Sequence, residues 1–124
     1  MRVLVLADDL IWSTRLIAQV QATGADAAPV RTIAALSQAM PAADAVIVDL
    51  TARAYDGIVA VRKAADAGRR VLAVGQHDDA ELRRRALAAG AERVLPYRKL
   101  FEDGEAVVRT WLAGAGPAAR RAFA

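Results

Sequence analysis

Three aspartates stand where they could bind a metal ion or accept a phosphoryl group. Asp8 and Asp9 follow the apolar segment 2–7, and Asp49 follows the apolar segment 45–48. Carboxylate oxygens are the ligands that Mg²⁺ prefers, and an aspartate beside such an ion can attack a phosphoryl group and form an aspartyl phosphate. The same residues also have a structural interpretation, since aspartate often caps a helix or closes a loop. The surrounding elements decide whether the three acids meet.

Apolar, β-branched runs alternate with segments of helical period along most of the chain. This alternation predicts a parallel sheet that is covered by helices on both faces. We therefore expect an α/β, flavodoxin-like (βα)5 fold with five parallel strands in the order 2-1-3-4-5. The expected strands are residues 2–7, 27–31, 45–48, 70–74 and 93–96, and the expected helices are residues 12–22, 32–40, 57–67, 79–89 and 101–112.

This strand order brings the three aspartates to one edge of the sheet. Ligands of doubly wound sheets bind outside the carboxyl ends of the strands. The strands that precede Asp8 and Asp49 are neighbours in the expected order, so their acids should converge. Because three carboxylates repel one another, the cluster predicts a counter-ion, and Mg²⁺ suits it best.

The composition limits the chain to one domain and excludes several kinds of site. A chain of 124 residues has the length of one domain with a single hydrophobic core. We expect one domain over residues 1–113 and a flexible C-terminal tail over residues 114–124, where glycine and proline interrupt the helical period. Cysteine is absent and His77 is the single histidine, so disulfides, thiol chemistry and a histidine-rich metal centre are excluded.

Membrane insertion, nucleic-acid binding and the common enzyme motifs find no support in the sequence. No run of 18 apolar residues occurs, and we expect a cytoplasmic protein. The net charge of +3 is mild, whereas a dedicated nucleic-acid binder usually concentrates its positive charge and adds stacking aromatics. Nucleic acid is therefore not an expected partner of this domain. Because glycine-rich dinucleotide loops, phosphate-binding loops and nucleophile elbows are all missing, we do not expect an enzyme.

Four segments of the chain are similar to segments of one known family. From Arg2 to about Leu112, the chain resembles the receiver domain of bacterial two-component response regulators, which take part in phosphorelay signalling. The segments that carry the likeness are Leu4-Val-Leu-Ala-Asp-Asp9, Val46-Ile-Val-Asp49, Asp56-Gly57 and Ala88-Ala-Gly-Ala91. The resemblance implies that Asp49 is the phosphoacceptor. It also implies that Mg²⁺ is held by Asp9 directly, by Asp8 through water, by Asp49, and by the backbone carbonyl of Thr51.

Three positions depart from the family's switch. The chain has Gly75 where the family places a serine or threonine that binds a phosphoryl oxygen. It has Tyr97 in place of the lysine that pairs with the acceptor, and Val94 where an aromatic ring often reports phosphorylation. We therefore expect an atypical receiver that keeps the acids of a metal site and lacks the usual means of reporting phosphorylation.

The resemblance implies an output through protein contacts. The expected partners are proteins such as a sensor kinase or an output domain, or a second copy of the chain in a homodimer. A candidate interaction face consists of the arginines Arg83, Arg84, Arg85, Arg93, Arg98 and Arg109; the alternative is a solvated helix surface. Two other functions remain open: a phosphorylation-independent pseudo-receiver that serves as a scaffold or dimerisation module, and a flavodoxin-like domain that binds a small ligand at the acidic edge.

Overall fold

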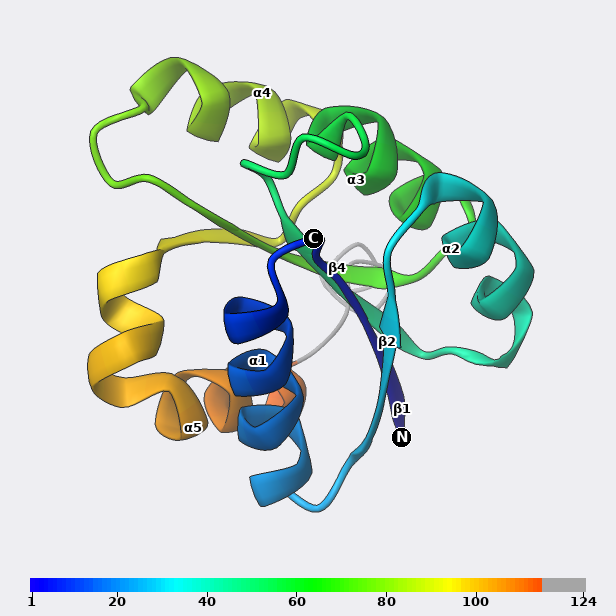
Figure 1. The fold of residues 1–124 in the computed structure, drawn as a ribbon, viewed down its shortest axis with the longest axis vertical. Helices are drawn as coiled ribbons and strands as arrows, with labels where there is room; N and C mark the ends of the chain where they lie inside the picture. Colours follow the sequence, from blue (N-terminus) through cyan, green and yellow to red (C-terminus); the bar gives the residue numbers. More distant parts are fainter. Residues whose placement is uncertain (115–124) are drawn as a thin grey trace.

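The computed structural model describes residues 1–114 and shows five strands that alternate with helices (Figure 1). The strands are short and mostly apolar. Four of the helices begin at an Asp or Thr side chain that caps their first amides. The strands are β1 (Arg2–Leu6), β2 (Asp26–Val30), β3 (Ala45–Asp49), β4 (Arg70–Gly75) and β5 (Arg93–Pro96). The helices are α1 (Leu10–Ala22), α2 (Ile33–Ala39), the 3₁₀ turn η1 (Met40–Ala42), α3 (Gly57–Asp66), α4 (Ala80–Ala89) and α5 (Tyr97–Ala113).

The strands form one parallel sheet in the order β2-β1-β3-β4-β5, which confirms the predicted topology. In this sheet Leu6 of β1 pairs with Val48 of β3, and Asp49 pairs with Val74 of β4. The carboxyl ends of β1, β3 and β4 therefore lie side by side at one edge. This register places the acids that follow β1 next to the acid that ends β3.

Each face of the sheet has its own apolar core. Helices α1 and α5 cover one face, and α2, α3 and α4 cover the other (Figure 1). Because side chains of a strand alternate between faces, Val5 and Ile47 pack under α1 and α5, whereas Leu6 and Val48 pack under the other helices. The β-branched runs are buried on both sides, as expected for parallel strands.

Two glycines allow helices to approach their neighbours closely. Gly57 opens α3, where a Cβ atom would lie 2.8 Å from the Cα atom of Leu50. Gly90 ends α4 with φ +120°, and its missing Cβ leaves room for Ala65 of α3. The glycines of the Asp56-Gly57 and Ala88-Ala-Gly-Ala91 segments thus have packing roles.

The last helix differs from the sequence-based expectation. It begins at Tyr97 rather than at Phe101, and it is kinked at Asp103, which has non-helical φ −135° and ψ 30°. At the kink, the Gln19 side chain of α1 lies against Gly104 and donates a hydrogen bond of 2.8 Å to the Leu100 carbonyl. The insertion of a neighbouring side chain is a common cause of helix kinks.

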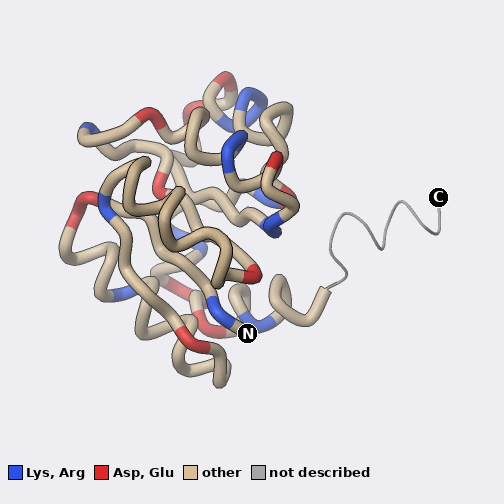
Figure 2. Tube along the Cα trace, turned by 90° about the vertical axis from the view of Figure 1, so that its right-hand side faces the viewer, with Lys and Arg blue, Asp and Glu red and all other residues tan. Residues whose placement is uncertain are grey.

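The sequence also predicts the absence of a membrane span and the presence of a flexible C-terminal tail. No helix among residues 1–114 is long and apolar enough to cross a membrane. The predicted flexible tail, residues 114–124, lies outside the described residues except for Gly114. Basic and acidic residues are interspersed along the described trace (Figure 2).

Candidate functional site

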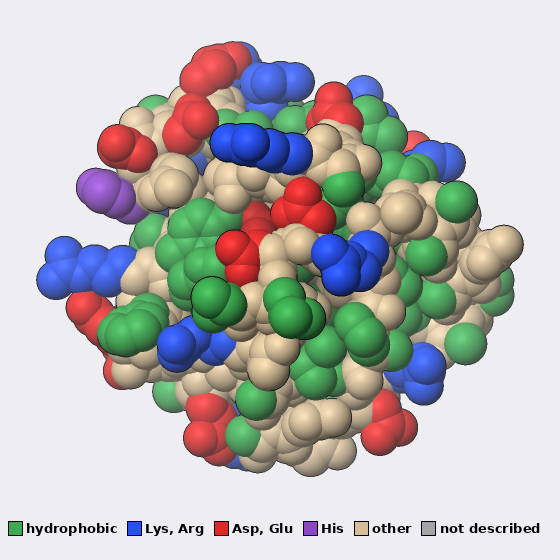
Figure 3. All heavy atoms as spheres, in the orientation of Figure 1, with side chains coloured by type: hydrophobic (Ala, Val, Ile, Leu, Met, Phe, Trp, Pro, Cys, Tyr) green, Lys and Arg blue, Asp and Glu red, His purple; other side chains and the backbone are tan. Residues whose placement is uncertain are grey.

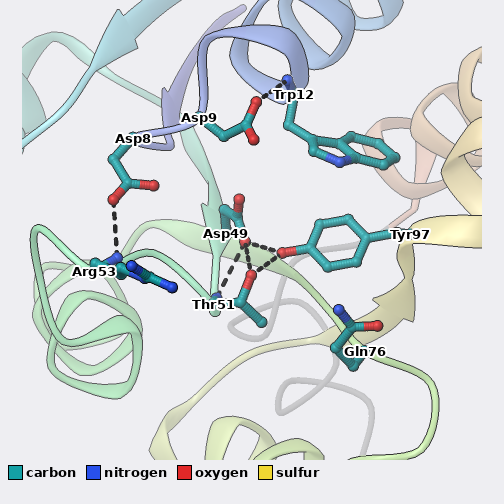
Figure 4. A pocket seen from close by; sticks show the side chains of 8 residues that line it. All are labelled: Asp8, Asp9, Trp12, Asp49, Thr51, Arg53, Gln76 and Tyr97. Atoms are coloured by element: carbon teal, nitrogen blue, oxygen red, sulfur yellow. Dashed lines mark hydrogen bonds between the residues drawn. The ribbon is translucent and has the colours of Figure 1, made fainter.

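Asp49 lies at the end of β3 with only 2% of its surface exposed, and hydroxyl groups surround one of its oxygens. Its Oδ1 atom accepts a hydrogen bond from the Thr51 amide at 3.1 Å, one from the Thr51 hydroxyl at 3.1 Å, and one from the Tyr97 hydroxyl. The Thr51 and Tyr97 hydroxyls also contact each other. Figure 4 shows Tyr97 reaching across the pocket to these two residues. A buried carboxylate is thus held by neutral donors.

Burial and the Asp49 carboxylate keep Tyr97 protonated. Burial raises the pKa of the Tyr97 phenol well above its ordinary value, and the hydrogen bond to Asp49 raises it further. The phenol is therefore a neutral donor at physiological pH. It occupies the position at which the resembled family has a lysine, so it supplies a hydrogen bond to Asp49 without a compensating positive charge.

Asp8 is tied to the loop that follows β3. Its Oδ2 atom accepts hydrogen bonds from the backbone amides of Arg53 at 2.8 Å and Ala54 at 3.1 Å. These amides, first of all that of Arg53, lower the pKa of the Asp8 carboxyl below its usual range. Asp8 therefore stays ionised and fixes the loop beside Asp49.

Asp9 is the N-cap of α1. Its Oδ1 atom accepts hydrogen bonds from the amides of Ile11 at 2.8 Å and Trp12 at 3.1 Å. This is the structural role that the sequence left open for an aspartate at this position, and it satisfies amides that have no partner within the helix. The other carboxylate oxygen of Asp9 is not used by the cap.

These acids line an open pocket of about 600 Å³ at the carboxyl edge of the sheet. The space-filling view shows acidic side chains gathered near the centre of this face (Figure 3). Among the described residues that line the pocket, Arg53 is the only cation, so acidic groups predominate. The lining residues are Asp8, Asp9, Trp12, Asp49, Thr51, Arg53, Gln76 and Tyr97.

The three acids do not form a closed metal site. Within residues 1–114, no group of three or more acidic, histidine or cysteine side chains is gathered tightly enough to enclose a metal ion. Asp8, Asp9 and Asp49 each use one oxygen for the hydrogen bonds described above and leave the other without such a bond. This donor set fits an ion that keeps several of its waters, as Mg²⁺ does.

A buried tyrosine joins β1 and β3 beneath the pocket. The Tyr55 hydroxyl lies 2.7 Å from the carbonyl oxygen of Asp49 and 2.9 Å from that of Leu6. Burial raises the pKa of Tyr55 far above its ordinary value, and the nearby charge of Asp49 adds to this effect. Tyr55 therefore braces the ends of both strands as a neutral donor.

Two of the three positions that depart from the family's switch, Gly75 and Val94, lie in β4 and β5. Gly75 is the last residue of β4, and a Cβ atom there would make an ordinary contact of 3.5 Å with Leu50. A serine would therefore fit. Val94 is buried in the core under α3 and α4, on the face of the sheet opposite to Tyr97.

The predicted arginine face is divided by the fold. Arg83, Arg84 and Arg85 are exposed on α4, where Arg84 pairs with Glu81 at 2.6 Å. Arg93 is the first residue of β5, so it lies at the amino ends of the strands, whereas the pocket lies at their carboxyl ends. Arg98 on α5 pairs with Glu102 at 2.8 Å. Arg109 donates to the Ala22 carbonyl, so it is turned toward α1 and away from α4. An interaction role for these residues stays a prediction.

The structure also shows contacts of the site that the sequence does not predict. The sequence presents Tyr97 as the substitute for a lysine, and in the structure its phenol reaches Asp49 directly. Trp12 packs against the Tyr97 ring with centroids 4.7 Å apart. The sequence shows that both positions hold aromatic residues, but it does not show that their side chains point into the pocket, because this orientation depends on how α1 and α5 pack together.

Comparisons with known proteins identify the fold. No protein-family model and no curated protein matches the sequence. Among solved structures, the signal receiver domain of a DNA-binding response regulator from Colwellia psychrerythraea 34H covers 92% of this chain and 99% of its own, with TM-score 0.77 and 18% identity. The BeF3-activated DrrB receiver domain covers 91% and 97%, with TM-score 0.79 and 18% identity. A response regulator from Thermotoga maritima covers 91% and 98%, with TM-score 0.77 and 14% identity.

The architecture is that of the flavodoxin-like class, with five parallel strands and helices on both faces. Within this class, the chain has the CheY-like fold of response-regulator receiver domains, and the likeness extends over most of its length.

Proposed function

We propose that this protein is an atypical receiver domain that acts in two-component signalling through protein contacts, as a signalling domain rather than as an enzyme. The observation that carries the proposal is the arrangement around Asp49: a buried carboxylate at the end of β3, beside two further acids, in a pocket at the carboxyl edge of the sheet. The receiver fold supports the same conclusion. A sensor kinase and an output domain are the expected classes of partner.

Asp49 is the proposed phosphoacceptor. Its Oδ1 atom is held by Thr51 and Tyr97, so Oδ2 is the oxygen left to attack. In the transfer, a bond forms between Oδ2 and phosphorus while the bond from phosphorus to the donor's leaving group breaks. Asp8, Asp9 and the Thr51 carbonyl would hold Mg²⁺ together with the Oδ1 atom of Asp49, where the ion would replace a hydroxyl hydrogen bond and leave Oδ2 to attack. When bound, the ion would offset the charge of the carboxylates and of a phosphoryl oxygen.

The replacement of a lysine by Tyr97 is what makes the receiver atypical. Catalysis of phosphoryl transfer depends on positioning and on neutralisation of charge. Tyr97 positions Asp49 but neutralises nothing, and Gly75 offers no hydroxyl for the phosphoryl group. We therefore expect Asp49 to accept a phosphoryl group slowly.

A titration of the whole chain with Mg²⁺, and then with beryllofluoride in the presence of Mg²⁺, tests the proposal. The tryptophan emission reports on the pocket because Trp12 lines it, whereas Trp111 is buried far from it in the α5 core. We expect a change in emission that the Asp49→Asn variant loses. The Trp12→Phe variant is the matched control and should lose the signal while retaining binding, as measured by calorimetry.

Two outcomes would contradict the proposed acceptor. If neither Mg²⁺ nor beryllofluoride binds to the wild-type chain, the domain is a scaffold or dimerisation module that works without phosphorylation. If a flavin or a nucleotide binds at the pocket without metal, the domain is a small-ligand binder on the same fold.

A further inference from the structure

A continuous series of side chains leads from the buried acceptor to the surface of α1 and α5. The Tyr97 hydroxyl donates to Asp49, and the Tyr97 ring packs against Trp12 with centroids 4.7 Å apart and planes inclined by 42°. The Arg15 guanidinium lies 5.7 Å from the centre of the Trp12 ring and 4.7 Å from that of the Phe101 ring. We refer to Tyr97, Trp12, Arg15 and Phe101 as the aromatic ladder.

The ladder connects a buried end with an exposed end. Asp49 is 2% exposed, whereas Phe101 is 64% exposed on the second turn of α5. A second pocket acid is attached to the same series, because Asp9 accepts a hydrogen bond from the Trp12 amide. Two of the three pocket carboxylates therefore contact the ladder. The series begins on α5, passes through two residues of α1 and returns to α5, so a shift of Tyr97 acts on both helices.

Among residues 1–114, the hydrogen bonds of the Asp49 carboxylate lead to Thr51 and Tyr97 and not to the helices on the other side of the sheet. Toward α4, the residue at the end of β4 is Gly75, which has no side chain to follow a change at Asp49. Val94 is packed in the core under α3 and α4, and valine has neither a hydroxyl nor a ring. Coupling between sites requires an element whose arrangement both sites influence, and among the described residues the ladder is the series of contacts that fits this requirement.

We infer that the aromatic ladder carries the state of Asp49 to the exposed surface of α1 and α5. When the Tyr97 hydroxyl loses Asp49 as its acceptor, the Tyr97 ring changes position, and Trp12, Arg15 and Phe101 follow. Cation–π and ring contacts depend steeply on geometry, so such a shift alters each contact in turn. The inference rests on the proposed function only in taking phosphorylation as the event that changes Asp49 in the cell. The contacts of the ladder do not depend on the proposed function.

Nuclear magnetic resonance of the whole chain tests the inference without metal or phosphoryl analogue. The reporters are the Trp12 indole N–H and the backbone amide of Phe101, with the Trp111 indole and the Leu87 amide on α4 as references. Asp49→Ala removes the acceptor, and Tyr97→Phe removes the donor while keeping the ring. We expect both variants to shift the Trp12 and Phe101 signals and to leave the references in place.

Two controls separate the ladder from a general disturbance of the pocket. Asp8→Ala removes a pocket carboxylate that bonds to the loop amides of Arg53 and Ala54 instead of the ladder, so it should not shift the Phe101 signal. In a Trp12→Leu background the ladder is interrupted, and Asp49→Ala should no longer shift Phe101. Circular dichroism verifies that each variant is folded.

The inference is overturned if Asp49→Ala and Tyr97→Phe both leave Phe101 unchanged, if the shift persists in the Trp12→Leu background, or if Asp8→Ala reproduces it. Because no metal or beryllofluoride is added, this outcome is independent of the titration that tests the acceptor role of Asp49. The aromatic ladder can therefore be disproved while Asp49 still accepts a phosphoryl group. Equally, Asp49 can fail as an acceptor while the ladder still connects it to Phe101.

Discussion

Tyr97 and Thr51 surround a buried carboxylate with hydroxyl groups, and this choice of donors sets the chemistry of the site. Both hydroxyls satisfy the Oδ1 atom of Asp49. Hydrogen bonds from neutral groups to a carboxylate are weaker than bonds from an ammonium or guanidinium. The arrangement thus gives the Asp49 carboxylate hydrogen bonds without a paired cation, and acidic groups predominate among the residues that line the pocket.

A lysine at position 97 should strengthen binding of the phosphoryl mimic. We expect Tyr97→Lys to tighten the Mg²⁺-dependent binding of beryllofluoride by about tenfold, since one charge-assisted contact is worth about 1.4 kcal/mol. Addition of Gly75→Ser, for which the backbone has room, should tighten it further. Calorimetric titration measures both effects. Tyr97→Met, which fills similar space without charge, is the control, and equal affinities of the Lys and Met variants would contradict the argument.

Tyr55 predicts a loss of stability at alkaline pH. Burial raises its pKa in the folded state, so the folded chain keeps a proton that the unfolded chain releases above pH about 10. The stability that the protonated Tyr55 contributes is therefore fully present below pH about 10, and it is lost as the pH rises toward the folded-state pKa. Tyr55→Phe cannot ionise, and it loses hydrogen bonding worth about 1 kcal/mol at neutral pH.

Urea unfolding at a series of pH values from about 7 to about 11 measures this effect, because the range includes the ordinary tyrosine pKa of about 10. We expect the stability difference between the wild type and Tyr55→Phe to narrow as the pH rises above about 10. Comparing the two chains cancels the titration of groups that they share. Parallel pH profiles would show that Tyr55 ionises equally in both states.

At the scale of elements, α5 depends on its contact with α1. The kink at Asp103 leaves room for Gln19, whose amide reaches the Leu100 carbonyl. A Cβ atom on Gly104 would overlap the end of the Gln19 side chain, so this side chain, and not the backbone conformation, opposes a larger residue at position 104. The two residues form one packing unit between the helices.

This unit predicts strongly non-additive substitutions. Gly104→Ala should destabilise the wild type by about 1–3 kcal/mol, because the new methyl group displaces Gln19. In a Gln19→Ala background the clash is absent, and Gly104→Ala should be neutral or stabilising by about 0.5–1 kcal/mol, as expected for alanine in a helix. Chemical denaturation of the four chains checks the cycle. Equal effects in both backgrounds would contradict the packing role.

At the scale of the whole molecule, Arg70 ties the sheet to the end of the last helix. It begins β4, pairs with Glu92 at 3.1 Å, and donates to the carbonyls of Trp111 at 2.6 Å and Leu112 at 3.1 Å. The Glu92 side chain is only 2% exposed and the Arg70 side chain 13%. The guanidinium also lies over the Trp111 ring. One side chain therefore joins β4, the turn before β5 and the C-terminus of α5.

Arg70→Met should destabilise the fold by about 3–5 kcal/mol, because it breaks a buried ion pair and removes the donor to the last carbonyls of α5. Thermal and urea unfolding measure the loss. Arg84→Met is the matched control, since the Arg84–Glu81 pair is exposed and its removal should leave the unfolding midpoint unchanged. Similar losses for both variants would contradict the role of burial.

The sequence by itself determined the order of the elements and the place of the site. Apolar β-branched runs and capping residues such as Asp56 and Asp79 act locally, so their consequences are readable along the chain. The convergence of Asp8, Asp9 and Asp49 also followed from the sequence, because the topology of parallel sheets leaves few arrangements.

Only the tertiary structure decided what each side chain of the site contacts. The sequence did not show that Asp8 binds loop amides, that α5 begins at Tyr97, or that the phenol of Tyr97 turns back to Asp49. These contacts join residues more than 40 positions apart. Their geometry depends on how Trp12 and the start of α5 pack together, and such long-range packing leaves no periodic signal in the order of residues.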